Sequence, residues 1–269
     1  MELSNVWLAF ALTLLAGLST GIGSLIALFA RRTNTAFLSL ALGFSAGVMI
    51  YVSMVEIYPL AQQAAVNTWG DGGLWAAAGA FFAGMILIAV IDKLVPSYEN
   101  PHEPHLLEEM EDGGASGQQE KLFRTGVLAA LAIAIHNFPE GLATFVSVLQ
   151  EPSLGIAIAV AIGIHNIPEG IAVSVPVYYA TGDRKKAFVY SFLSGLSEPL
   201  GALIGYLVLL PFINEALFAL LFASVAGIMV FVSLDELLPA AREYGEAHHS
   251  VYGIITGMMV MALSLLLMG

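Results

Sequence analysis

A six-residue pattern, His-Asn-x-Pro-Glu-Gly, occurs at residues 136–141 and again 29 positions later at 165–170. In a helix, side chains at positions i, i+3 and i+4 share a face, so the imidazole, amide and carboxylate of each copy point the same way. Imidazole nitrogens and carboxylate oxygens bind zinc and other divalent transition metals. The ligands that the two copies offer are His136, Asn137, Glu140, His165, Asn166 and Glu169.

The surroundings of both copies have the composition of a membrane interior. Of the 269 residues, 58% are hydrophobic and 11% are charged. Apolar runs recur at the roughly 17–25 residues that a helix needs to cross a bilayer, and the alternating pattern of barrel strands is missing. We therefore predict an all-α polytopic membrane protein, a single transmembrane transport domain over 1–269. Its eight transmembrane helices are expected near 6–29, 36–58, 74–95, 122–148, 153–179, 186–210, 212–236 and 250–268.

Carboxylates at the centre of a bilayer need a compensating charge, because burying them unpaired costs several kcal/mol. No Lys or Arg lies within the core of either motif helix. One divalent cation between Glu140 and Glu169 would neutralise both, and His136 and His165 would complete a four-ligand shell suited to zinc. Glu198, in the Ser-Glu-Pro of the sixth span, would form a harder, oxygen-rich neighbouring site with the Asn and Glu side chains of both copies.

The prolines of the two copies predict an irregular backbone beside the ligands. Pro139 and Pro168 lack an N–H and clash with the carbonyl four residues earlier, that of Ile135 or Ile164. We expect each helix to be broken or kinked there. Carbonyls freed in this way at the middle of a membrane can line a polar cavity and join the coordination of a cation.

A second, fainter repeat relates spans two and seven. The sequence AGVMIYVSMVEIYP in span two aligns with AGIMVFVSLDELLP in span seven at an offset of 180 residues. Because these spans, like spans four and five, must cross in opposite directions, both repeats predict a 3+2+3 inverted architecture, typical of secondary transporters. Packing demands on small residues can also produce such likeness. Glu56 and Glu236 lie near span ends, where carboxylates need no function, although they could guide ions into a pathway.

The basic residues predict the orientation. All nine lie in the connections that lead from an odd-numbered span to the next even-numbered one, or directly beside those connections. By the positive-inside rule, these connections face the cytoplasm and both termini lie outside it. The longest of them, 96–121, is Pro-, Gly- and Ser-containing and acidic, and we expect it to be mobile.

The chain resembles the ZIP family of divalent metal transporters, most closely its bacterial ZupT branch. The resemblance lies in the doubled motif, the Ser-Glu-Pro of span six, the eight spans and the acidic loop with His102 and His105. The resemblance covers essentially the whole chain. It implies a 3+2+3 inverted repeat in a cell membrane, the inner one in a bacterium, and uptake of divalent transition metals into the cytoplasm. It implies a first site of His136, Glu140, His165 and Glu169, and a second of Asn137, Glu140, Asn166, Glu169 and Glu198.

Two alternatives from other classes are an intramembrane metallohydrolase and a metal-sensing receptor. The hydrolase fits poorly, because each copy has one His and every carboxylate would be used as a ligand. We therefore expect that the chain is not an enzyme and uses no cofactor. Its cargo is expected to be Zn²⁺ or another divalent metal ion, namely Fe²⁺, Co²⁺, Mn²⁺ or Cd²⁺. The absence of Cys excludes thiolate ligands, and a net charge of −12 disfavours nucleic acid. Lipid surrounds the chain, and small-residue faces on spans one and six would permit a homodimer, although internal packing uses such faces too.

Overall fold

The computed structural model describes residues 3–29, 35–94, 115–209, 212, 214–244 and 247–268. Within these ranges the chain forms helices and no strand, which confirms the all-α prediction. The helices, with π-helical segments marked η, are α1 (Leu3–Phe29), α2 (Thr35–Val52), η1 (Ser53–Ile57), α3 (Tyr58–Trp69), α4 (Gly72–Leu94), α5 (Ala115–Gln150), α6 (Pro152–Thr181), α7 (Arg184–Gly195), α8 (Ser197–Ile204), η4 (Gly205–Leu209), α9 (Glu215–Val232), η6 (Ser233–Leu237), α10 (Leu238–Tyr244) and α11 (Ala247–Met268).

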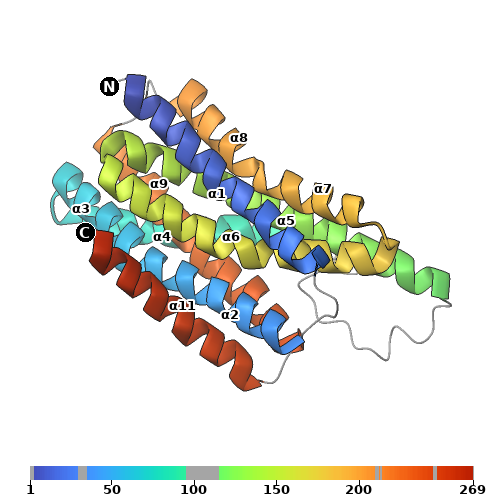
Figure 1. Cartoon of the computed structure of the whole chain (residues 1–269). Coiled ribbons are helices and arrows are strands. Elements are labelled where there is room, and N and C mark those ends of the chain that lie inside the picture. The colour runs from blue at the N-terminus through green and yellow to red at the C-terminus, as the bar shows by residue number, and fades with distance from the viewer. Residues whose placement is uncertain are drawn as a thin grey trace.

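The long helices lie side by side in two groups (Figure 1). In the first, which we call the motif bundle, α1 and α5 pack on α6, α5 packs on α8, and α7 packs on α1 and α6. In the second, the flanking bundle, α2 packs on α11 and α10, while α3 and α4 pack on α9. The two bundles meet where α2 lies against α6 and α5 against α9. Helix α1 begins, and helix α11 ends, at the same end of the molecule (Figure 1).

Seven stretches of the described residues are long and apolar enough to cross a membrane. They correspond to seven of the eight predicted spans. Helix α5, which contains the predicted fourth span, is not among them, but it has 36 residues and packs between α6 and α8. Span two is longer than predicted, because η1 and α3 continue it to Trp69. The loop predicted at 96–121 is shorter, since α5 begins at Ala115, and residues 95–114 lie outside the described ranges.

Glycines let neighbouring backbones touch inside each bundle. A Cβ on Gly47 of α2 would overlap the backbone oxygen of Ile254 on α11, and one on Gly227 of α9 would overlap that of Phe81 on α4. Gly47 and Gly227 are equivalent positions of the 180-residue repeat. In the motif bundle, Gly170 packs in the same way on α1. Small residues that permit such close approach are the usual means of packing helices in lipid.

Of the π-helical segments, η1 and η6 also lie 180 residues apart. Each has five residues and a glutamate at its fourth position, and the second residue after each segment is a proline, Pro59 or Pro239. Such wide turns are rare and occur often at functional sites. The repeat of spans two and seven thus extends to an unusual backbone feature, while the inverted repeat of the whole chain stays a prediction.

Each motif helix is predicted to be broken or kinked at its proline, and a break there is wrong. Helices α5 and α6 run without interruption through Pro139 and Pro168, because packing by neighbouring helices can hold a membrane helix together across a proline. The break lies in span six instead, at Leu196, where α7 ends and α8 begins. Pro199 cannot donate to the carbonyl of Gly195 four residues earlier, so the helix is interrupted there.

Candidate metal centre

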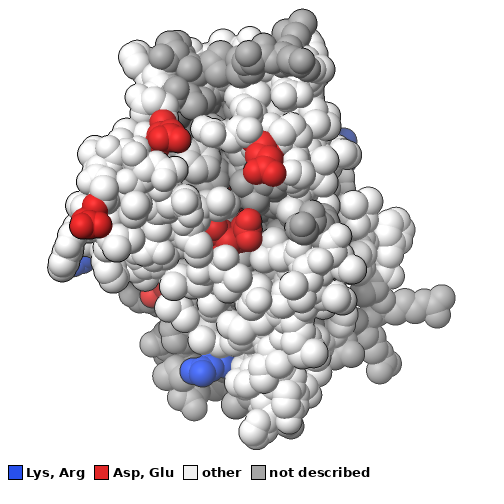
Figure 2. Space-filling view, turned by 90° about the vertical axis from the view of Figure 1, so that its left-hand side faces the viewer, with Lys and Arg blue, Asp and Glu red and all other residues white. Residues whose placement is uncertain are grey.

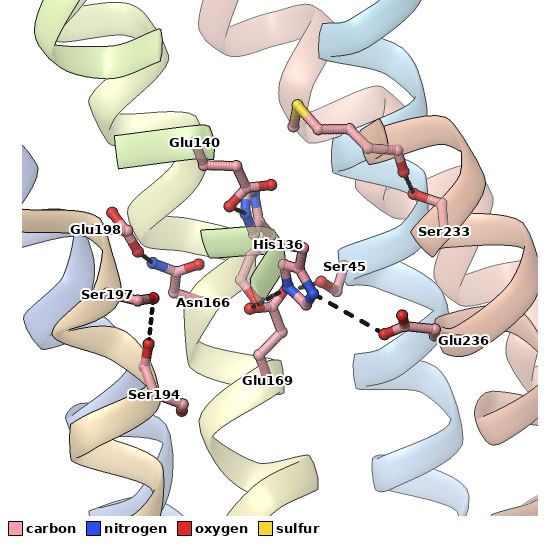
Figure 3. Close-up of polar contacts among 12 residues, drawn as sticks. Ser45, His136, Glu140, Asn166, Glu169, Ser194, Ser197, Glu198, Ser233 and Glu236 are labelled. Atoms are coloured by element: carbon pink, nitrogen blue, oxygen red, sulfur yellow. Dashed lines mark hydrogen bonds and ion pairs between the residues drawn. The ribbon is translucent and has the colours of Figure 1, made fainter. Parts of the chain in front are cut away.

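The seven predicted ligands are all buried, and none is more than 1% exposed. Helices α5 and α6 carry the two motif copies, and Glu198 lies in the first turn of α8, directly after the break at Leu196. In Figure 3 the labelled side chains from these three helices point toward one another between the ribbons. Directly after the break in span six, Glu198 accepts a hydrogen bond from Asn166 of α6.

The imidazoles and carboxylates of the two copies pair crosswise. Nε2 of His136 on α5 lies 3.4 Å from Oε2 of Glu169 on α6. Nε2 of His165 on α6 lies 3.4 Å from Oε2 of Glu140 on α5. The two contacts join the same kinds of atoms and have the same length. Helices α5 and α6 pack on each other here, and each imidazole faces the other helix's carboxylate.

The amides of the two copies lie in different surroundings. Asn166 donates from Nδ2 to Oε1 of Glu198 and also to the carbonyl of Ala16 on α1, at 2.9 Å in the second case. Asn166 and Glu198 are thus brought together as predicted for the second site. Neither side-chain atom of Asn137 has a hydrogen-bond partner within the described structure.

Many of these buried polar atoms form no hydrogen bond with the described residues. In a membrane interior such an atom costs free energy unless a cation or another polar group interacts with it. Imidazole nitrogens and the oxygens of carboxylates, amides and hydroxyls can all coordinate a divalent ion. The atoms at the centre in this condition are Nδ1 and Nε2 of His136, both amide atoms of Asn137, Oε1 of Glu140, Oγ1 of Thr144, Nδ1 of His165, Oδ1 of Asn166, both oxygens of Glu169 and Oε2 of Glu198.

The ligands are neighbours but are not gathered around one point. Among the described residues, no group of three or more His, Asp or Glu side chains is close enough to hold an ion as it stands. The donors are arranged instead as contacting pairs. Binding a metal would require the two pairs to close on a common centre.

Two further residues contact the centre from the flanking bundle. Glu236 of η6 is buried, and its Oε2 lies 3.9 Å from Nδ1 of His136. Ser45 of α2 donates from Oγ to the carbonyl of His165 at 3.2 Å. From the sequence, Glu236 is expected near a span end, where it could guide ions, and not at the centre. It lies in η6, and π-helical turns occur often at functional sites, but the sequence pattern does not reveal such a turn.

Carboxylates also lie at the end of the molecule where α1 begins. Figure 2 shows this end, with acidic side chains across its upper and central part and one of them recessed near the middle. The connections and helix starts at this end contain Asp71, Glu151 and Glu215. A surface of this charge raises the local concentration of cations.

Comparison with known proteins identifies the family. Residues 93–265 match the family model described as ZIP Zinc transporter. The chain is 65% identical over 270 residues to the zinc transporter ZupT of Nitratidesulfovibrio vulgaris, covering 98% of each chain. It is 62% identical over 267 residues to the protein of the same name from Oceanobacillus iheyensis, covering 99% of this chain and 100% of the relative. These matches extend over the motif helices and both bundles, and the chain belongs to the ZIP zinc transporter family.

Proposed function

We propose that this chain carries divalent transition-metal ions, zinc foremost, into the cytoplasm through the centre formed by α5, α6 and α8. The chain belongs to a family of transporters, so it is not an enzyme, and zinc is its cargo and not a cofactor. The relatives from Nitratidesulfovibrio vulgaris and Oceanobacillus iheyensis are both named zinc transporters. Fe²⁺, Co²⁺, Mn²⁺ and Cd²⁺ are further candidate cargoes, because sites built from nitrogen and oxygen donors accept them too.

The observation that carries this proposal is the length of the two crossed pairs. Ligand atoms about 2.0–2.1 Å from a tetrahedral zinc ion lie about 3.3–3.4 Å from each other. The His136–Glu169 and His165–Glu140 pairs each have a separation of 3.4 Å. Each pair therefore already has the spacing of one edge of a zinc tetrahedron. A small approach of the two pairs would bring two nitrogens and two oxygens around one ion.

Charge supports the same assignment. Glu140 and Glu169 are fully buried, and the imidazoles that face them carry no charge when they act as ligands. A divalent ion would neutralise both carboxylates. Asn137, Asn166 and Glu198 would provide the oxygen-rich second site, in which Glu140 and Glu169 would bridge two metals.

For the route, we propose that ions arrive at the acidic end in Figure 2, which would face away from the cytoplasm with both termini. The basic residues of the loops favour this orientation. All seven proposed ligands belong to the motif bundle, so a shift of that bundle against the flanking one would carry the site as one body. Relative motion of two parts around a site near the midplane is common in transporters built from inverted repeats.

Zinc uptake by the purified full-length chain in proteoliposomes tests the proposal. His136→Ala and Glu169→Ala should each abolish uptake almost completely, whereas His248→Ala, which removes an exposed histidine of α11, should keep it. Uptake at the unaltered rate in Glu169→Ala would remove this residue from the site. Zinc binding without any flux in the unaltered chain would favour a receptor over a transporter.

A further inference from the structure

The two glutamates of the π-helical segments occupy equivalent positions in the repeat. Glu236 is the fourth residue of η6, and Glu56 is the fourth residue of η1, 180 positions earlier. The motif copies are related in the same way, so that His136 and His165 are equivalent. If the repeat were exact, a contact between Glu236 and the imidazole of His136 would be matched by one between Glu56 and the imidazole of His165.

Only one of these two contacts is present. Oε2 of Glu236 faces Nδ1 of His136 at 3.9 Å, and both side chains are buried. Nδ1 of neither imidazole forms a hydrogen bond with the described residues. Among these residues, however, the ion-pair contact of His165 is with Glu140 through Nε2, and Glu56 makes none with it. Glu56 is half-exposed. The crossed His–Glu pairs are equal in length, so this asymmetry does not arise from the separation of the motif pairs.

The segments η1 and η6 lie toward opposite ends of α2. Ser39, near the start of α2, donates to the carbonyl of Ala241 in α10, so η6 and α10 lie beside the end at which α2 begins. Segment η1 follows the other end of α2, and α3 packs there on α9. Glu236 thus approaches the centre from one side of the membrane and Glu56 from the other.

A carboxylate on Nδ1 has a defined effect on a metal-binding histidine. When Nδ1–H donates to a carboxylate, Nε2 keeps its lone pair and the ring is held in one orientation. In both motif copies it is Nε2 that faces the carboxylate of the other helix. At 3.9 Å, Glu236 is too far from Nδ1 of His136 for a hydrogen bond, but it faces that atom and could orient the imidazole on closer approach. Glu56 makes no such contact with His165 in this state.

We propose that Glu56 and Glu236 are alternating positioning residues of the proposed transport site. Glu236 faces His136 in the state seen here and orients it when the pair closes to hydrogen-bond distance on metal binding, and Glu56 does the same for His165 in the opposite state, after the motif bundle has moved toward η1. Two equivalent halves that adopt different conformations exchange them when access alternates between the two sides. The inference rests on the proposed function, since it assigns both histidines to the metal.

Zinc transport in uniformly oriented proteoliposomes tests the exchange, measured separately for zinc added at the η1 end and at the η6 end. Glu56→Ala should raise the half-saturating zinc concentration by about 10–100-fold at the η1 end, the usual loss when a carboxylate behind a metal-bound histidine is removed. At the η6 end the value should change by less than about 3-fold, and Glu236→Ala should show the reverse. Glu56→Gln should restore most of the affinity, because its amide oxygen still accepts from Nδ1–H. Asp235→Ala, which removes an exposed carboxylate of η6 beside Glu236, is the matched control.

Double variants separate positioning from a general effect on folding. The quantity measured is the residual zinc affinity. Glu56→Ala should not lower it further in a His165→Ala background, but should lower it by the full amount in a His136→Ala background. Equal effects in both backgrounds, or equal shifts at both ends, would overturn the exchange. If His165→Ala itself left transport and zinc affinity intact, the proposed site would fail first. If His165→Ala lost affinity and Glu56→Ala did not, only the exchange would fail.

Discussion

Replacing Glu169 by Gln should remove zinc-dependent stabilisation without destabilising the zinc-free protein. The substitution keeps the size of the side chain and an acceptor oxygen 3.4 Å from Nε2 of His136, but it removes one buried negative charge. His136 can remain neutral, so no unpaired charge is left behind. Replacing a buried charge under these conditions is often neutral or stabilising.

The expected size follows from linkage. At a zinc concentration 100 times its Kd, binding stabilises the folded protein by about 2.7 kcal/mol. If the lost charge costs about 3 kcal/mol of zinc binding, Kd rises about 150-fold. At the same zinc concentration the stabilisation then falls to about 0.3 kcal/mol. At about 2–4 °C per kcal/mol, the zinc-induced rise in Tm should fall from about 5–11 °C to about 1 °C.

Thermal unfolding of the detergent-solubilised chain, followed by intrinsic fluorescence with and without zinc, measures both quantities. Glu140→Gln should behave like Glu169→Gln, because the two crossed pairs have equal lengths. Glu215→Gln, at an exposed position, should keep the full zinc-induced rise in Tm. An unchanged zinc effect in Glu169→Gln, or a large fall in the Tm of the zinc-free variant, would refute the reasoning.

Three other predictions concern packing, pH and capping. Gly227→Val should lower Tm by several degrees, because its Cβ would meet the backbone oxygen of Phe81, whereas Gly79→Val should not, as nothing lies within 4 Å of its Cβ. Acidifying the loading side from pH 7 toward 5 should raise the half-saturating zinc concentration, because protons compete for imidazole and carboxylate; a flat profile would contradict histidine ligation. Asp183→Ala should cost about 0.5–2 kcal/mol of stability by removing the N-cap of α7, with zinc affinity unchanged.

The helical membrane architecture was predictable because lipid leaves the backbone few choices. Apolar runs of membrane-crossing length predict helices whatever the details of their packing. The meeting of the two motif copies was predictable for a related reason. A polar group at the middle of such a helix must find a polar partner, and the richest source of partners for His136 and Glu140 is the second copy on α6. The crossed pairing itself was not predicted, because it depends on how α5 and α6 cross.

The prolines show why local rules did not suffice. Pro139 and Pro168 have the same missing N–H as Pro199, yet only the helix of Pro199 is interrupted. In α7 and α8, serine hydroxyls take up carbonyls near the break: Ser194 donates to Ser191 at 2.7 Å, and Ser197 donates to Ser194 at 2.6 Å. Because these hydroxyls bond to backbone carbonyls near the break, they reduce the free-energy cost of interrupting the helix in lipid. The choice between a continuous and a broken helix is thus made by neighbouring groups, which a count of prolines does not contain.

The contacts within the bundles differ in kind from the contacts between them. Within a bundle, glycines bring backbones together, as Gly141 does on Glu198 and Gly47 on Ile254. Between the bundles, the described contacts at the centre are made by side chains, those of Ser45 and Glu236. Interlocked backbones cannot slide without clashes, whereas side-chain contacts can be released and formed again. We infer that relative motion costs least at the boundary between the bundles. Ligands on α5, α6 and α8 would then move together, and a carboxylate of the flanking bundle would have to release its histidine in every cycle.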